Sequence, residues 1–245
     1  MGGRTRRHQN HPRWHEVKSE DRNPKTEGNP KTEIRKVLVC FALKEEARPF
    51  QQRGGERDDI KIILVGMGKR NAERAIRDAL EQERPQLVLT CGSAGGLRPA
   101  LTIGTVVFDA DAETGLEPAL LAAGAQRARF HCSDRVATTA AEKRALWQST
   151  RADAVEMESE VIRAVCREQN IPSATVRAIL DTAEEDLPLD FNQLMTPKQE
   201  MSYAKLALVL VKSPGKVGAL LRLQKHTQAA ARRLAEVLAR ITAAG

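Results

Sequence analysis

The amino-acid sequence predicts an α/β protein whose single folded domain has three layers, αβα, with a mostly parallel central sheet. Two observations predict this fold class. Short runs rich in Val, Ile and Leu alternate along the chain with longer helical segments. Several of these runs are almost entirely apolar, which is typical of parallel strands that helices cover on both faces. With 245 residues, the chain can bury such a core without disulfides or a metal ion.

The expected elements follow one another from residue 34 onward. We expect strands at 35–43, 60–68, 85–97, 104–110 and 172–181, the third of them running into a glycine-rich turn. We expect one helix to begin at 44–47 and three further helices to span 71–83, 141–150 and 152–170. Two helical stretches follow, split at 213–216. In such sheets ligands bind beyond the carboxyl ends of the strands, so polar residues at these ends are the candidates for a site.

The first 33 residues differ from the rest of the chain. They are polar and basic and repeat the text "NPKTE" at 23–27 and 29–33. Since they offer almost nothing to bury, we expect residues 1–33 to be a disordered basic tail and 34–245 to be the folded domain. His8, His11 and His15 lie in this tail without nearby cysteines, and we therefore predict no metal site and no cofactor.

Cysteine usage and hydropathy indicate a cytoplasmic protein. The four cysteines, which include Cys132, are widely spaced, without a C-x-x-C pair. Cys40, Cys91 and Cys166 lie in apolar or glycine-rich runs. We expect them to be reduced. No apolar run reaches transmembrane length, and the N-terminus has no apolar segment of the signal-peptide type.

The formal net charge of +7 is concentrated near the C-terminus. Residues 204–245 set one acid, Glu236, against the basic residues Lys205, Lys212, Lys216, Arg222, Lys225, Arg232, Arg233 and Arg240. This basic helical segment could meet anionic lipid at the inner membrane, contact nucleic acid non-specifically, or be a solvated helix face. Its apolar stripe, Leu234, Val237, Leu238 and Ile241, suits either a membrane surface or packing as an ordinary terminal helix.

An acid on an apolar helix face is the first candidate for chemistry. Glu158 lies at i when Val161, Ile162 and Val165 lie at i+3, i+4 and i+7, so its carboxylate should point into the protein and needs a cation, backbone amides or ligand hydroxyls. It would suit the vicinal hydroxyls of a ribose. The glycines of the "TCGSAGGL" segment, Gly92, Gly95 and Gly96, could belong to a ligand site or could simply form a tight turn.

Two further acids complete a set suited to cleaving a glycosidic bond. Asp181 follows an apolar strand, where partial burial would raise its pKa and keep a proton available, although it could also cap a helix. Glu46 could hold a water molecule as a general base. Arg177 lies four residues before Asp181, an even spacing that would place both side chains on one face of a strand.

The segments "ALKEEA", "TCGSAGGL", "VEMES" and "RAILD", in this order and spacing, resemble the purine nucleoside/uridine phosphorylase superfamily. Within it they are most similar to the methylthioadenosine/S-adenosylhomocysteine nucleosidases, over residues 35–195. The resemblance implies a nucleoside phosphorylase-like fold, a homodimer, and a nucleoside as the small-molecule substrate. It implies catalytic roles for Glu46 with the water, for Ser93 and Arg177 as helpers around it, and for Asp181 as the acid that protonates purine N7.

The resemblance also implies the contacts with the substrate. Met157 and Glu158 match the ribose contacts, and Ala94 and Gly95 belong to the glycine-rich segment beside it. "SDRVATTAAEK" resembles the segment that holds the base, with Val136 in place of a stacking aromatic residue and Ala137 meeting the adenine edge through its backbone. Leu180 departs from the small polar residue that orients the acid in the nucleosidases.

The nucleophile distinguishes a nucleosidase from a phosphorylase. Phosphorylases of the superfamily carry an arginine where this chain has Leu87, and their phosphate-binding loop is replaced by "LKEEA". A phosphate dianion beside Glu46 would be repelled, so water is the expected nucleophile. A phosphate-dependent phosphorylase using Arg177 is the alternative. A relative that binds a nucleoside or nucleic acid without turning it over is a second alternative.

The substrate's 5′ side is expected to be open. The stretch from "GTVVFDA" to "SDRV" is short, and "VATTAAEK" together with "SPGKVGALLRL" resembles the hopanoid-associated phosphorylase-like proteins. This resemblance implies release of adenine from a 5′-substituted adenosine such as adenosylhopane. We expect no specific nucleic-acid partner.

Overall fold

The computed structural model describes residues 1–2, 36–196 and 202–243. The chain divides into Met1–Glu33 and Ile34–Gly245, and the second unit carries the fold described below. The expected tail, with its three histidines, lies outside the described residues apart from Met1 and Gly2.

An eight-stranded sheet forms the centre of the domain. Its main path is β2–β1–β3–β8–β4–β5, with β7 paired to β3 and β6 paired to β7. β1, β2, β3 and β8 run parallel, whereas β4 runs antiparallel to β8. The strands are β1 Val37–Phe41, β2 Ile60–Leu64, β3 Leu87–Gly96, β4 Val106–Ala110, β5 Gln126–Arg127, β6 Phe130–Cys132, β7 Ala154–Glu156 and β8 Ser173–Asp181.

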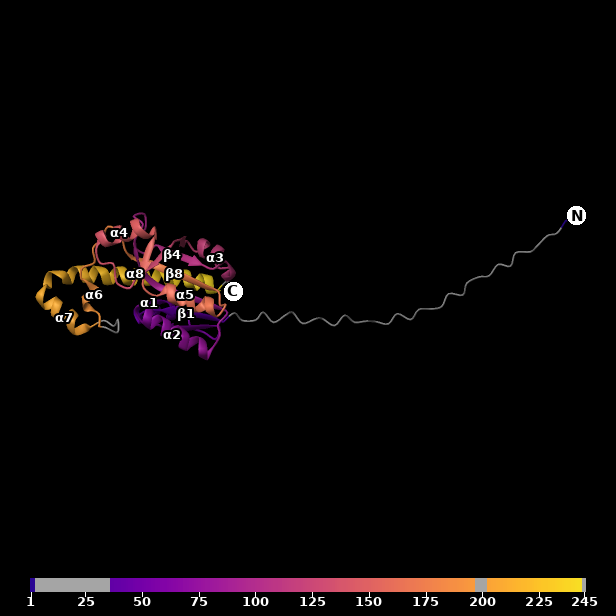
Figure 1. The fold of residues 1–245 in the computed structure, drawn as a ribbon, viewed down its shortest axis with the longest axis horizontal. Coiled ribbons are helices and arrows are strands. Elements are labelled where there is room, and N and C mark those ends of the chain that lie inside the picture. Colours follow the sequence, from indigo (N-terminus) through magenta and orange to yellow (C-terminus); the bar gives the residue numbers. More distant parts are fainter. Residues whose placement is uncertain (3–35, 197–201, 244–245) are drawn as a thin grey trace. The chain divides into compact units, whose positions relative to one another are not determined.

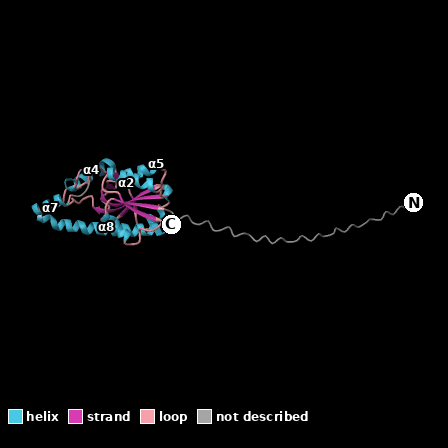
Figure 2. Ribbon diagram, turned by 90° about the horizontal axis from the view of Figure 1, so that it is seen from below, coloured by secondary structure: helices cyan, strands magenta, loops and turns pink. Residues whose placement is uncertain are grey.

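Helices cover both faces of this sheet, as Figures 1 and 2 show. α1 (Lys44–Gln51), α3 (Glu117–Ala122) and α8 (Val217–Ala243) pack on one face, and α2 (Lys69–Gln82) and α5 (Ser159–Glu168) pack on the other. The alternation of β1 explains how one strand serves both layers: its odd-numbered residues join the core cluster with α8, while its even-numbered residues join the cluster with α2 and α5. The predicted three-layer α/β class is therefore confirmed.

The remaining helices lie near one end of the sheet. They are α4 (Ala140–Thr150), α6 (Phe191–Leu194) and α7 (Tyr203–Lys212), with short 3₁₀ turns at Ala112–Thr114 and Pro214–Lys216. The predicted helix at 141–150 and the break at 213–216 are confirmed. The sequence patterns did not indicate α3, α6, β5 or β6, each of which has six residues or fewer.

Two expectations for local structure are wrong. The glycine-rich segment 92–96 is not a turn, because β3 continues through it to Gly96 and pairs there with β7 and β8. The segment 152–170 is not one helix either. Its first part forms β7, and α5 begins only at Ser159, with Glu158 at the N-cap position.

The C-terminal helix α8 has two different environments. From Ala230 onward its apolar residues lie in the core, including the expected stripe Leu234, Val237, Leu238 and Ile241, all of which are buried. Of the two alternatives for this stripe, packing as an ordinary terminal helix is therefore confirmed, and its four side chains are not available to a membrane. No helix in the described part of the chain is both long and apolar enough to cross a bilayer.

Candidate active site

Two glycines of β3 bring the candidate residues together. A Cβ atom built on Gly92 would lie 2.6 Å from Arg177 Nη1 and 3.0 Å from Glu46 Oε2. A Cβ atom on Gly95 would lie 3.5 Å from Asp181 Oδ2. The missing side chains therefore leave room for the charged groups. The two glycines are three residues apart, so the spaces that they leave are separated by a rise of roughly 10 Å along the strand.

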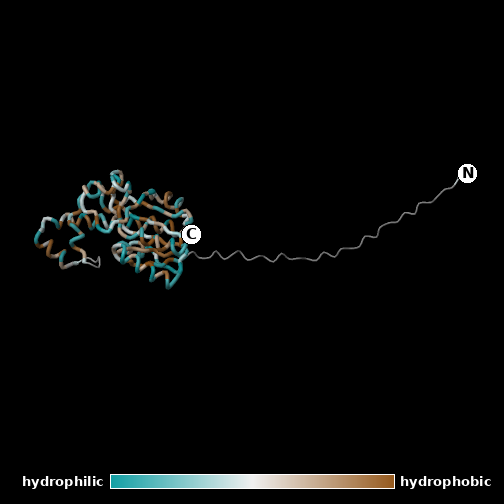
Figure 3. Tube along the Cα trace, viewed as in Figure 1, coloured by the Kyte–Doolittle hydropathy of each residue, from teal (hydrophilic) through white to brown (hydrophobic). Residues whose placement is uncertain are grey.

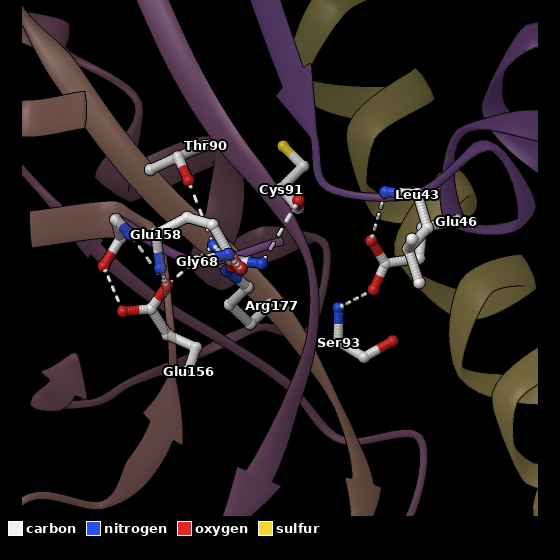
Figure 4. A network of polar contacts seen from close by, with 10 residues as sticks. Leu43, Glu46, Gly68, Thr90, Cys91, Ser93, Glu156, Glu158 and Arg177 are labelled. Carbon is white, nitrogen blue, oxygen red and sulfur yellow. Dashed lines mark hydrogen bonds and ion pairs between the residues drawn. The ribbon is translucent and has the colours of Figure 1, made fainter. Parts of the chain in front are cut away.

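Glu46 is held by backbone amides at the end of β1. Its Oε1 accepts a hydrogen bond from the Ser93 N–H at 2.8 Å, and its Oε2 accepts one from the N–H of Leu43, the N-cap residue of α1, at 3.3 Å (Figure 4). The side chain is buried. A carboxylate fixed by two amides retains free lone pairs, and it can hold and deprotonate a water molecule.

Arg177 is the centre of a buried ionic network. Its Nη2 donates to Glu156 Oε2 at 2.8 Å, to Glu158 Oε2 at 3.3 Å and to Thr90 Oγ1 at 3.2 Å, while Nη1 reaches the Cys91 carbonyl at 3.4 Å (Figure 4). The surrounding carboxylates raise its pKa, so the guanidinium stays charged although it is 2% exposed. This pairing supplies the cation that the buried position of Glu158 requires.

Glu158 is buried as expected, though at a helix start instead of on a helix face. The Gly68 N–H donates to its Oε1 at 2.9 Å, and Arg177 donates to Oε2. Burial raises the pKa of this carboxyl to about 7, with Arg177 acting in the opposite direction. Both oxygens keep a lone pair for a further donor such as a sugar hydroxyl. Met157, beside it, is also buried.

Asp181 lies apart from Arg177 because of a β-bulge. The register of β8 against β3 shifts so that Ala94 pairs with Ile179 and Gly95 pairs with Asp181, which leaves Leu180 as the extra residue. A bulge breaks the alternation of side chains. The expectation that Arg177 and Asp181 share a face by even spacing is therefore wrong.

The bulge directs Asp181 toward a lysine that was not among the predicted site residues. Lys143, from α4, forms an ion pair with Asp181 Oδ2 and donates to the Thr182 and Glu185 carbonyls at 2.8 and 2.6 Å. Its side chain is 0% exposed, so the ammonium depends on these three contacts in place of water. Burial raises the pKa of Asp181, whereas the Lys143 charge lowers it, and the net direction is upward.

The segment expected to hold a base lies beside α6. Asn192 binds Val136 twice, accepting from its N–H and donating to its carbonyl, both at 2.9 Å. Among the described residues no hydrogen bond engages the N–H or carbonyl of Ala137, so its backbone is available to a ligand. The Ala94 side chain packs in an apolar cluster, which leaves only its backbone for contact.

Two residues of the site were missed in the sequence, although both carried a signal. Glu156 accepts hydrogen bonds from the Glu158 and Ser159 N–H groups as well as from Arg177, and it lies between apolar neighbours. Lys143 lies three and four residues before Leu146 and Trp147, the same helical spacing that drew attention to Glu158.

Comparison with known proteins agrees with this architecture. The family model described as "Phosphorylase superfamily" matches residues 125–212, which is less than half of the chain. The structure is similar to that of futalosine hydrolase from Helicobacter pylori, with a TM-score of 0.64 and 16% identity over 86% of this chain and 99% of that one. It is also similar to the 5′-methylthioadenosine/S-adenosylhomocysteine nucleosidase from Neisseria meningitidis, with a TM-score of 0.63 and 18% identity over 86% of this chain and 100% of that one.

These comparisons define the class of fold. The chain has the nucleoside phosphorylase/nucleosidase fold. Glu46 and Asp181 lie at the carboxyl ends of β1 and β8, where ligands bind in parallel α/β sheets, while Arg177 pairs with Gly92 inside the sheet. Because the identities are below 20%, the likeness establishes the architecture, and the activity has to be argued from the side chains.

Proposed function

We propose that this protein is a nucleosidase that hydrolyses the N-glycosidic bond of a 5′-substituted adenosine and releases adenine. The observation that carries the proposal is the grouping of three units around the glycines of β3. These units are the amide-held Glu46, the Arg177–Glu158 pair, and the Asp181–Lys143 pair. Together they supply a base for water, an acceptor for hydroxyls and an acid for the leaving group.

Asp181 is the proposed acid that protonates the purine N7 as the C–N bond breaks. Burial raises its pKa above the ordinary carboxyl value, although Lys143 acts in the opposite direction, and this favours the protonated form that an acid needs. When the proton leaves, a carboxylate forms in a buried place, and the Lys143 ammonium is already held beside it. A charge that is fixed in advance where charge develops lowers the barrier without reorganisation. Lys143 thus takes the orienting role that Leu180 leaves open.

Glu46 is the proposed base for the attacking water, with Ser93 and Arg177 as neighbours of that water. The backbone of Ser93 fixes the carboxylate, and both Glu46 and Arg177 adjoin the space left by Gly92. Glu158 and Met157 are proposed to contact the ribose, and the backbones of Gly95, Ala94 and Ala137 to contact the sugar and the adenine, with Val136 beside the base.

The charge balance favours water over phosphate. Arg177 is surrounded by Glu46, Glu156 and Glu158, whose charges all act on its pKa, so its charge is already compensated. A phosphate dianion would meet this set of carboxylates. Leu87 adds little to the argument, since it is buried at the opposite end of β3 from Gly92.

We expect adenine release in phosphate-free buffer, because hydrolysis consumes only water. The measurement is chromatography of the products from adenosine and a panel of 5′-substituted adenosines, with and without phosphate. Free sugar without phosphate supports the nucleosidase. A strict requirement for phosphate with a sugar 1-phosphate as product indicates the phosphorylase alternative, and absence of any turnover across the panel indicates a binding protein.

The same panel tests the 5′ substituent. The resemblance to hopanoid-associated proteins and the short segment between β4 and β6 support a large apolar substituent, as in adenosylhopane. We expect kcat/KM to rise with the size of an apolar 5′ group. A preference for methylthioadenosine over longer alkyl analogues would contradict this part of the proposal.

Glu158→Gln should reduce activity more on ribosides than on 2′-deoxyribosides. The substitution preserves shape but removes the charge that strengthens hydrogen bonds from the two hydroxyls, and a deoxyriboside lacks one of them. The measurement is kcat/KM for adenosine and 2′-deoxyadenosine, with the exposed Glu160→Gln as control. An equal loss on both substrates would show that Glu158 only supports Arg177.

A further inference from the structure

Exposed apolar side chains gather on the hairpin formed by α7, the 3₁₀ turn and the start of α8, here called the α7–α8 hairpin (202–225). Leu208 is 54% exposed, Val211 80%, Val217 42% and Leu221 54%. Leu208 and Val211 are three residues apart on α7, and Val217 and Leu221 are four apart on α8, so each pair shares a helix face. Figures 1 and 3 show this hairpin beyond the end of the sheet, with apolar residues along α7.

The hairpin is also strongly basic. Its exposed charged residues are all cations: Lys205, Lys212, Lys216, Arg222 and Lys225. The sequence contains no Asp or Glu between residues 202 and 235. Among the described residues no carboxylate forms an ion pair with any of these cations. Within the part of the chain that the structure describes, the positive charge of the hairpin is therefore left without a paired carboxylate beside exposed apolar groups.

Hydrogen bonds connect the hairpin to the candidate active site. Lys205 donates to the Gln193 and Met195 carbonyls, both at 3.1 Å, and the Ser202 N–H donates to the Leu194 carbonyl at 2.8 Å. Asn192, in the same short helix α6, binds the backbone of Val136. The hairpin is therefore connected, through α6, to the segment proposed to hold the base.

We propose that the α7–α8 hairpin docks on the surface of an anionic lipid bilayer. The two properties complement such a surface: the cations meet lipid headgroups, and Leu208, Val211, Val217 and Leu221 enter the interfacial layer. A nucleic acid would use the cations but leave the apolar groups in water. A second copy of this chain would bring like charges together at a symmetric contact. This inference concerns binding alone and does not depend on the proposed chemistry.

Sedimentation with lipid vesicles tests the proposal on the full-length chain. The probes are vesicles of phosphatidylcholine alone and of equal parts phosphatidylcholine and phosphatidylglycerol, at low and high salt. We expect binding to the anionic vesicles only, weakened by salt. Lys212→Gln with Lys216→Gln should weaken binding roughly twenty-fivefold, since each basic residue contributes about fivefold. Leu208→Ser with Val211→Ser should weaken it roughly tenfold.

Matched controls separate docking from general charge and exposure. Lys61→Gln with Arg74→Gln removes two exposed cations elsewhere, and Leu64→Ser with Leu121→Ser removes two exposed apolar groups elsewhere. Both control variants should bind as the wild type does, and circular dichroism should show all variants folded. The proposal is overturned if the wild type stays in the supernatant with anionic vesicles at low salt, or if the controls lose as much binding. It is also overturned if Leu208→Ser with Val211→Ser turns an oligomer into monomers while vesicle binding stays at the wild-type level. Vesicle binding is read without substrate, so its failure leaves the proposed activity untouched.

Discussion

Replacing Asp181 by asparagine is expected to lower turnover by roughly 10²–10⁴-fold, the usual loss for a missing general acid. Asparagine has no proton to give to the purine, and the contacts of Lys143 with the Thr182 and Glu185 carbonyls remain. Because the buried Lys143 ammonium loses its anion, the variant should also lose stability, and turnover is compared at a temperature at which both proteins are folded. The measurement is kcat for adenine release, with circular dichroism and thermal melting of both proteins as checks on the fold.

Asp58→Asn is the matched control, because Asp58 is exposed and lies just before the start of β2, at the end of the sheet away from the candidate residues. It should leave kcat unchanged. In the wild type, activity that depends on protonated Asp181 should fall as the pH rises through the pKa of that residue, which burial has raised. Near-normal turnover in the Asp181→Asn variant would remove this residue from the mechanism.

Lys143→Met is expected to destabilise the domain by about 3–5 kcal/mol, because it leaves the buried Asp181 without its cation. The loss should depend on pH. Without Lys143 the pKa of Asp181 in the folded state rises further above its unfolded value of about 3.9. A raised folded pKa means that stability is present at low pH and lost as the pH rises. The variant should therefore lose more stability at pH 8 than at pH 5, measured by urea unfolding.

The double variant Lys143→Met with Asp181→Asn provides the control. Removing both charges should recover part of the lost stability and abolish the pH dependence, because a double-mutant cycle isolates the pair. If Lys143→Met loses the same stability at both pH values, Lys143 acts by packing and by its two carbonyl contacts alone. In that case the assigned effect of the Lys143 charge on the pKa of Asp181 would be wrong.

Hydrophobic patterns predicted the layers but not where strands end. The runs at β1, β2, β4 and β8 were found because their apolar residues have to be buried. The segment 92–96 was misjudged because glycine normally favours turns, whereas here it extends a strand whose missing side chains admit Arg177 and Asp181. The helix at 152–170 was predicted too long because pairing with β3 and β6 fixes residues 154–156 as a strand, and such pairing is not local in sequence.

The candidate site was partly predictable for the same reason. Glu158 was found as a charge at an apolar position, and the structure gives it a cation. The second carboxylate that pairs with Arg177, Glu156, and the Lys143 contact with Asp181 depend on which elements meet in space. The bulge at Leu180 likewise follows from the register between β3 and β8. A single sequence carries no record of these tertiary contacts.

Because α8 is continuous, it connects the hairpin rigidly to the core. It has 27 residues without a break, a length of about 40 Å at 1.5 Å per residue, and its buried part begins at Ala230. A flexible linker would let the domain rotate freely above whatever the hairpin touches, but a helix anchored in the core transmits orientation. Anything bound at the hairpin therefore meets the sheet at one fixed distance and angle. For the same reason, truncation before Ser213 would remove core residues together with the hairpin, so only point substitutions can distinguish the two.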